Sequence, residues 1–388
     1  MFLAGRPFLI PMGSSEQLAG ALKQVVTRGD FAVPPYPAVA LRLQKLLASP
    51  SHGIGDVADV IAADAALAAT ILAAANSAVQ KGAQEITTLS RAVNRLGARA
   101  VASLALAAGV GAGAMTPGVL FDVKYRAWRR SLTCALLCQK LAPHRELDAE
   151  ESFLAGLLHG FGRSVAIASL EKVIQQHKPS RPLSVSEWLS IAEKNRAELA
   201  LTVAQRWKLP QEIVSAFDPA TDDARSRLLV DADRMAAQID VGETPNLQNP
   251  SEAAALDDFL RGLPQALLAL APPPDDAGKP NDAVAALERP SSCDKKPSGF
   301  VVTDLRANAP ASLTCFGIGC TTLELESSRP FQESSVARVA VGKDEPSLNL
   351  WLNVVCCIPK GGNYHVEMQL FSTTKELREQ WQALYRAA

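Results

Sequence analysis

The residue of this chain best suited to chemistry is His159, within the segment Leu154-Ala-Gly-Leu-Leu-His-Gly-Phe-Gly-Arg163. An imidazole here could ligate a divalent cation, but a catalytic metal centre generally needs about three protein ligands. The next residue, Gly160, offers no side chain, and none of the histidines of this sequence lies four residues from another, so no helical ligand pair exists. The sequence favours a buried histidine satisfied by hydrogen bonds.

Other catalytic signatures are missing from the sequence. It contains no Gly-x-x-x-x-Gly-Lys-Ser/Thr phosphate loop and no Gly-x-Ser-x-Gly nucleophile turn. The glycines between 109 and 113 lie in an apolar helical run without a preceding strand, which disfavours a dinucleotide loop. Glu150 and Glu151 are neighbours on an expected helix and point apart, as solvated surface residues do. We therefore predict that the chain is not an enzyme and has no catalytic residue.

Six short segments follow one another in a characteristic order along the first 240 residues. They are Phe31–Leu43 with Pro34 and Pro37, Val57–Ala65, Leu72–Ala78 with Asn76 and Ser77, Ile86–Gly97, Ala127–Leu132 with Trp128, and Gln205–Pro210 with Trp207. Together with the His159 segment they resemble the HDOD domain, the HD-related output domain of bacterial signalling proteins. The resemblance covers roughly residues 20 to 240. It implies an all-α fold that relays signals by binding a protein partner.

The chain departs from the HD phosphohydrolase pattern at the metal ligands. In that family the His159 segment carries His-Asp side by side, and a distant His and Asp complete the site. Here Gly160 replaces the aspartate, and Arg130 stands where the first histidine would fall. Arg196 and the pair Asp218–Pro219 stand where related domains often keep histidines. The resemblance therefore implies a vestigial metal position at His159, with no metal and no cofactor.

Length and periodicity predict a multidomain protein. The chain has 388 residues, more than one core usually organises. Helical patterns dominate residues 1–271, which we assign to an all-α HDOD-like bundle. Examples are Ser14–Arg28, the uncharged run Ala100–Met115, a capping box at Ser184–Glu187 and Arg225–Ile239. The run Ala100–Met115 is too short to span a membrane, so we expect an interior helix.

A proline-rich stretch separates this bundle from a β domain. Residues 272–298 combine proline, glycine and charge, as flexible linkers do. Within 299–388, the segments 320–326, 337–341, 348–354 and 364–370 alternate apolar and polar residues and predict strands, and Thr374–Arg386 predicts a closing helix. The expected fold is a small, mainly-β barrel.

This layout weakly resembles PilZ, the bacterial receptor module for cyclic di-GMP, through Ser312–Gly317. The Arg-x-x-x-Arg arm of that family is incomplete, because Pro310 follows four residues after Arg306. Cyclic di-GMP binding is therefore disfavoured but kept as an alternative, and an unrelated β domain remains open.

Charge argues against nucleic acid as the main partner. The net charge is -1, whereas nucleic-acid binding usually leaves a basic footprint. Arg91, Arg95 and Arg99 recur every four residues, which places them on one helical face. A partner-facing or solvated stripe is the favoured interpretation, and phosphate binding is the alternative. The seven cysteines lack a zinc-ribbon spacing and imply no disulfide framework.

These patterns predict a cytoplasmic bacterial signal-transduction protein that acts by protein–protein interaction. Neither an export signal nor a membrane span is expected. The alternatives are a cyclic di-GMP receptor, acting through the β domain, and a residual metal-dependent phosphohydrolase.

Overall fold

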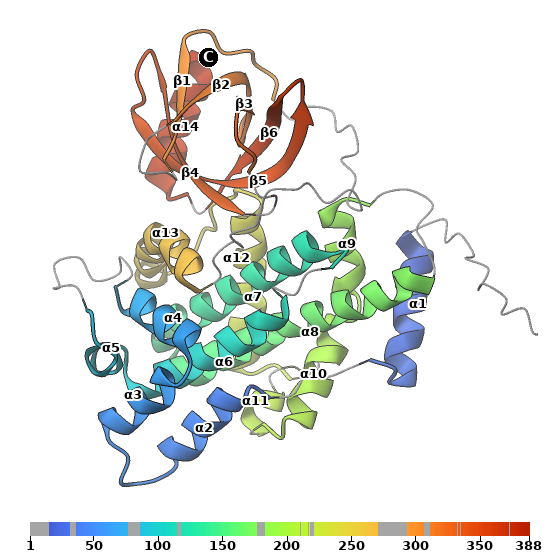
Figure 1. Ribbon diagram of the computed structural model, residues 1–388, viewed down its shortest axis with the longest axis vertical. Coiled ribbons are helices and arrows are strands. Elements are labelled where there is room, and N and C mark those ends of the chain that lie inside the picture. The colour runs from blue at the N-terminus through green and yellow to red at the C-terminus, as the bar shows by residue number, and fades with distance from the viewer. Residues whose placement is uncertain are drawn as a thin grey trace, which may run out of the picture.

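The computed structural model describes residues 15–31, 36–76, 86–114, 118–176, 183–209, 211–215, 217, 221–270, 293–305, 311–331, 333, 335–371 and 373–388. Several residues singled out in the sequence lie outside these ranges: Pro34, Ser77, Pro210, Asp218–Pro219, Arg306, Pro310 and most of the expected linker, 271–292. A helical bundle and a β barrel make up the described structure (Figure 1).

The first unit is an all-α bundle, as the sequence predicted. Periodicity predicted some of its helices, such as α1, α6 and α12. The helices are α1 (Ser15–Arg28), α2 (Ala38–Leu47), α3 (Ile54–Ala62), α4 (Ala65–Asn76), α5 (Leu89–Leu96), α6 (Ala98–Ala114), α7 (Phe121–Leu141), the 3-10 turn η2 (Ala142–Arg145), α8 (Ala149–Gln176), α9 (Val185–Glu193), α10 (Arg196–Arg206), α11 (Gln211–Ser215), α12 (Ala224–Asp240) and α13 (Pro250–Leu270). The capping box is confirmed: Ser184 Oγ accepts from the Glu187 N–H at 3.3 Å, and Glu187 Oε2 accepts from the Ser184 N–H at 2.8 Å.

Helix α8 runs through the middle of the bundle (Figure 1). Its segment Ala149–Ile174 is the one helix of the described residues long and apolar enough to pass as a membrane span by length and composition. In the structure 83% of that apolar stretch is buried. Such a stretch is also what the central helix of a bundle requires, so the pattern is weak evidence for a membrane.

Glycines on α8 allow it to approach α7 closely. A Cβ at Gly160 would lie 2.7 Å from Ser131 Cα, and one at Gly156 would lie 2.8 Å from Ala135 Cα. Both distances are shorter than real Cβ contacts, so any larger residue would push the helices apart. The crossing therefore accounts for the glycine at position 160, where the HD pattern has a metal ligand.

Gly97 breaks the chain between two helices that the sequence suggested were continuous. Helix α5 ends at Leu96, Gly97 adopts φ +86°, and α6 begins at Ala98. A positive φ suits glycine, which lacks the Cβ that strains other residues there. The expectation that Arg91 and Arg99 share one face of a single continuing helix was therefore wrong, because Arg99 lies on α6.

The C-terminal unit is a closed antiparallel barrel with strand order β1-β2-β3-β6-β5-β4. Its elements are β1 (Phe300–Asp304), β2 (Ala311–Ile318), β3 (Thr322–Ser327), β4 (Val336–Lys343), β5 (Leu348–Lys360), β6 (Asn363–Leu370) and α14 (Lys375–Ala387). Trp381 of α14 is fully buried in the barrel core. Alternation located β3 to β6 but missed β1 and β2. The last residues of the expected linker belong to this unit, since Lys295 pairs with Ile318.

The barrel lies against the bundle (Figure 1), and a set of polar side chains joins the two units. Arg129 of α7 donates to Asn353 Oδ1 of β5 at 2.7 Å, and Asn353 Nδ2 donates to the Asp240 carbonyl at 3.1 Å. Asp240, the last residue of α12, also accepts from Arg126 at 2.8 Å. Phe371 of the barrel lies under the Arg129 guanidinium, 5.0 Å from ring centroid to Cζ. We call Arg129, Asp240 and Asn353 the seam triad.

Candidate functional site

His159 faces an arginine where a metal ion would be expected. It lies on α8 and is buried, and its Nε2 is 2.5 Å from Arg196 Nη1 at the start of α10. Arg196 Nε donates to Glu193 Oε1 at 2.6 Å, which fixes the guanidinium. The guanidinium has only donors, so the imidazole nitrogen accepts.

Arg163, one helical turn after His159 on α8, adds further ion pairs. Arg163 Nε donates to Glu193 Oε2 at 2.8 Å and Arg163 Nη2 donates to Asp233 Oδ1 at 3.2 Å. Arg130 of α7 donates to the other Asp233 oxygen at 3.2 Å. His159, together with Arg130, Arg163, Arg196, Glu193 and Asp233, forms what we call the arginine cluster. It joins helices α7, α8, α10 and α12 with the C-terminal end of α9.

The protonation states of the cluster follow from its burial. Burial, reinforced by Arg196, lowers the pKa of His159 to about 3, so its imidazole is neutral at pH 7. Burial opposes ionisation of Asp233, but attraction by Arg163 and Arg130 outweighs it and holds the pKa of that carboxyl well below its usual value. Asp233 and Glu193 in turn raise the pKa of Arg163 despite its burial. The neighbouring arginines likewise lower the pKa of Glu193, so both acids are ionised at pH 7.

These residues do not fit a divalent cation. The His159 nitrogen that would face a metal accepts a hydrogen bond from Arg196, and both Asp233 oxygens accept from guanidinium groups. Three positive charges would also repel the ion. Across the described ranges, no three His, Cys, Asp or Glu side chains come together as a metal site. Guanidinium groups lie at the position where the resemblance predicted a vestigial metal site.

Sequence reasoning found only part of this cluster. It placed His159, Arg130 and Arg196 at vestigial ligand positions, and the structure brings all three together. Asp233 and Glu193 were not predicted, and Arg163 was named only as the last residue of the His159 segment. The four-residue spacing of His159 and Arg163 on one helix was the available signal; nothing local in the sequence points from them to Asp233.

A cavity opens beside His159 and Arg196. Its volume is about 540 Å³, within the range of small-molecule sites. The described residues that line it are His159, Arg196, Ala197, Phe217, Thr221, Asp222, Ser226, Arg227, Leu229, Val230 and Asp231. The Phe217 and His159 rings face each other at 6.4 Å with an interplanar angle of 24°. We call this the His159 cavity.

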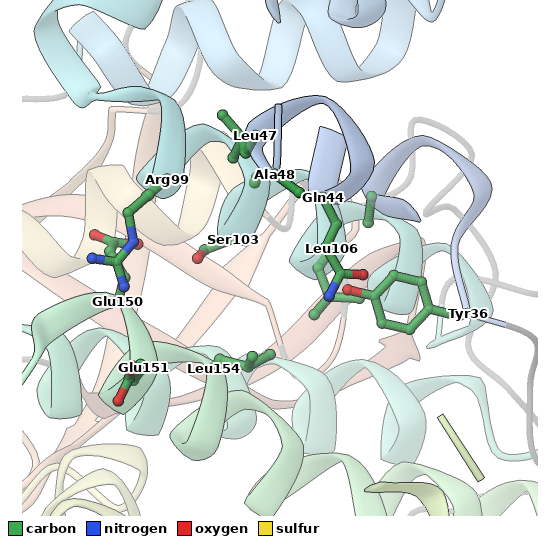
Figure 2. A pocket seen from close by; sticks show the side chains of 12 residues that line it. Tyr36, Gln44, Leu47, Ala48, Arg99, Ser103, Leu106, Glu150, Glu151 and Leu154 are labelled. Carbon is green, nitrogen blue, oxygen red and sulfur yellow. The ribbon is translucent and has the colours of Figure 1, made fainter. Parts of the chain in front are cut away.

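A second cavity, of about 410 Å³, contains one of the predicted partner-facing arginines (Figure 2). It runs between α2 and the first turns of α8, with α6 behind. Arg99 stands near Glu150 and Glu151 at one end and Tyr36 lies at the other, with apolar side chains between them. Arg99 forms two hydrogen bonds with Asp148, at 3.0 and 3.1 Å. We call this the Tyr36 groove.

The three predicted arginines have different surroundings. Arg91 is exposed. Arg95 is partly buried and donates to the Ala75 carbonyl at 3.2 Å. Arg99 lies on the next helix, α6, and lines the Tyr36 groove, so the three side chains do not form one continuous stripe.

The other signature residues hold the bundle together. Asn76 pairs with both backbone groups of Ile86, each at 2.8 Å. Trp128 is buried and leaves room only for a glycine at Gly111. Their roles are structural.

Three further contacts complete this scaffold. The Trp207 ring packs edge-on against Tyr36, with 5.2 Å between ring centroids, and stacks on Phe161, with 5.6 Å between centroids. Pro37 precedes α2 and packs against Gly109. These contacts fix α2 over α6 and α10.

The first unit of the chain is an all-α helical domain with a buried cluster of arginines around His159. The match of a family model specifies it further: residues 33–221 match the HDOD domain. This part of the chain is an HDOD domain, and a six-stranded barrel follows it.

The chain is also similar to individual proteins and solved structures. A protein of Treponema pallidum (strain Nichols) named "Uncharacterized protein" is 24% identical over 192 residues, which cover 48% of this chain and 37% of that relative. The chain thus matches little more than a third of the relative's length. A crystal structure from Shewanella amazonensis SB2B, named "Putative metal-dependent phosphohydrolase", has a TM-score of 0.50 at 21% identity and covers 66% of this chain and 95% of its own. An HDOD domain protein from Geobacter sulfurreducens has a TM-score of 0.41 at 19% identity, covering 66% and 90%. The Shewanella structure shows a shared fold, and fold alone does not set activity.

Proposed function

We propose that this chain is a non-catalytic signal-transduction protein, whose HDOD domain acts by binding a protein partner. The observation that carries the proposal is the arginine cluster. Arg196 donates a hydrogen bond to the His159 nitrogen that would otherwise coordinate a metal. Gly160 lies where α7 and α8 cross too closely to admit an aspartate. Hydrolysis by an HD-type centre needs a metal-bound water, and these residues cannot hold that metal. The HDOD signalling family supplies the expectation of a relay role.

The first experiment tests for residual hydrolysis. Purified full-length protein, equilibrated with Mn²⁺, Ni²⁺ or Mg²⁺ and desalted, is analysed for bound metal and assayed with bis(p-nitrophenyl) phosphate. We expect substoichiometric metal and no turnover above buffer. Stoichiometric metal with turnover that Asp233→Asn abolishes would establish the phosphohydrolase alternative and overturn the proposal.

The second experiment tests partner binding with the intact chain, because the seam joins its two units. Ser103 points into the Tyr36 groove (Figure 2), so Ser103→Phe fills the groove. Ser190→Phe, an exposed serine on α9, is the matched control. In affinity capture from bacterial lysate, we expect the wild-type protein and the control to retain a specific protein that Ser103→Phe loses. Capture of background alone by all three chains would contradict a protein-binding role.

Cyclic di-GMP reception by the barrel stays an alternative from sequence alone. The residues that would form the nucleotide arm, 306 to 310, lie outside the described ranges. Saturable binding of cyclic di-GMP by the full chain would support it.

A further inference from the structure

The arginine cluster carries more positive than negative charge. Its ionised groups are three guanidiniums, of Arg130, Arg163 and Arg196, and two carboxylates, of Asp233 and Glu193. Three minus two leaves one positive charge, and the neutral imidazole adds none. A net charge in a largely buried cluster is unfavourable unless a counter-charge lies nearby. Counted over the residues that the structure describes, the cluster is therefore one negative charge short of balance.

Carboxylates on the cavity rim do not supply that anion. Asp222 accepts from Arg227 at 2.9 Å. Asp231 accepts from Arg145 at 2.9 Å and from Arg234 at 3.2 Å. Because each of these acids is already paired with an arginine, neither neutralises the excess positive charge of the cluster beside the His159 cavity.

Hydrogen-bond donors of the cluster are also in excess. Arg163 Nη1 is buried and, among the described residues, has no hydrogen-bond partner. Of the three arginines, Arg196 is the one that lines the cavity, and 15% of its side chain is exposed, so a ligand in the cavity can reach it. Its Nε and Nη1 are hydrogen-bonded to Glu193 and His159, which leaves Nη2 to donate a charge-assisted hydrogen bond to a carboxylate or phosphate.

The cavity is larger than an inorganic anion requires. A volume of about 540 Å³ fits an organic molecule. Phe217, which faces the His159 ring, provides a flat aromatic wall, and Leu229 and Val230 add apolar surface. Such walls suit a planar apolar group, while Arg196 suits a negative charge.

We propose that the His159 cavity binds a small organic anion, with a carboxylate or phosphate against Arg196 and a planar ring against Phe217. The ligand supplies the negative charge that the cluster lacks. The site lies in the place of the HD metal centre and needs neither metal nor turnover. It would give the signalling protein a chemical input separate from its protein partner.

Calorimetric titration of the full-length protein tests this proposal with four probes: phenyl phosphate, benzoate, inorganic phosphate and benzamide. Benzamide matches benzoate in shape without its charge. We expect phenyl phosphate and benzoate to bind at least about tenfold more tightly than benzamide, which corresponds to one charge-assisted contact. Phenyl phosphate should also bind more tightly than inorganic phosphate, because only phenyl phosphate has a ring that can pack against Phe217.

Two variants locate the site. Arg196→Met should weaken benzoate at least about tenfold, since it removes the charged fork. Val230 is 64% exposed on the cavity rim, so Val230→Glu leaves the core intact, and its negative charge should weaken benzoate while Val230→Lys strengthens it. Ile54→Glu, at an exposed apolar position on α3, is the control. Equal binding of benzamide and benzoate, no saturable binding, or benzoate affinity unchanged in both Arg196→Met and Val230→Glu would overturn the proposal.

Discussion

Helix α7 is packed in two different ways on its two sides. Toward α8 the contact is steric, with Gly156 and Gly160 allowing the helix backbones to approach. Toward the barrel the contact combines apolar packing of Val336, Trp351 and Phe371 with the hydrogen bonds of the seam triad, which are 2.7 to 3.3 Å long. The first contact is the core of one domain. The second adds buried polar groups to apolar packing, as contacts between domains do.

The difference shows how one helix serves two neighbours. Arg129 and Arg130 are consecutive, yet Arg129 reaches Asp240 and the barrel while Arg130 reaches Asp233 and the arginine cluster. Both aspartates lie on α12, seven residues or two turns apart, on one face. Helix α12 therefore touches the cavity, the cluster and the barrel in succession.

The largest effect is expected at the seam. Arg129→Met removes a buried charge from between Asp240 and Asn353, and leaves two acceptors short of a donor. We expect the free energy of unfolding to fall by about 3–5 kcal/mol, measured by urea denaturation of the full chain. Arg234→Met is the control, because that side chain is 56% exposed and the loss should stay below about 1 kcal/mol. Equal losses would mean that the seam does not contribute to stability.

The steric side is tested by adding a single methyl group. Gly160→Ala places a Cβ 2.7 Å from Ser131 Cα, so α7 and α8 must separate. A loss of about 3 kcal/mol is expected from this overpacking. Gly20→Ala in α1, where the added Cβ meets no atom within 4 Å, should instead stabilise by about 0.5–1 kcal/mol. The opposite signs of the two changes distinguish packing from helix propensity.

A pH titration of stability compares the cluster with the rest of the chain. An unfolded histidine binds a proton near pH 6.5, whereas His159 in the folded protein does so only near pH 3. Between these values the unfolded state holds more protons, so stability falls as pH is lowered from about 6.5 toward 4. His159→Gln should flatten this slope, and His52→Gln, an exposed histidine, should keep it. An unchanged slope in His159→Gln would place the proton uptake elsewhere.

The smallest effect is expected at the edge of the seam. Thr244 after α12 donates to the Thr373 carbonyl after β6 at 3.0 Å. Thr244→Val preserves the shape and removes that bond, for a loss of about 1 kcal/mol in chemical denaturation. Thr202→Val, on an exposed face of α10, controls for the substitution. A loss no greater than that of the control would show that this edge adds nothing to docking.

How much could be read from the sequence depended on how local each signal was. Local sequence patterns of a few residues predict helices such as α12, the capping box at Ser184 and the alternating strands β3 to β6. Strands β1 and β2 are short or include the bulge between Cys315 and Gly317, which breaks the alternation. The break at Gly97 was missed because glycine inside a helical pattern need not adopt a positive φ.

The candidate site was less predictable because its partners are far apart in the chain. Asp233 meets Arg163 across 70 residues, and Asn353 meets Arg129 across 224. No periodicity encodes such pairs. The resemblance located His159, Arg130 and Arg196 because related domains place ligands there, but the salt bridges that join these residues to Asp233 and Glu193 are visible only in the folded structure.

The close crossing at Gly160 also limits which residues this position can accept. An aspartate there would place its side chain where even a methyl group collides with Ser131. A metal site would further require Arg196 to leave His159, so two changes at separate positions would have to occur together. The glycine therefore constrains how the sequence of this domain can vary, through the distance between two helix backbones.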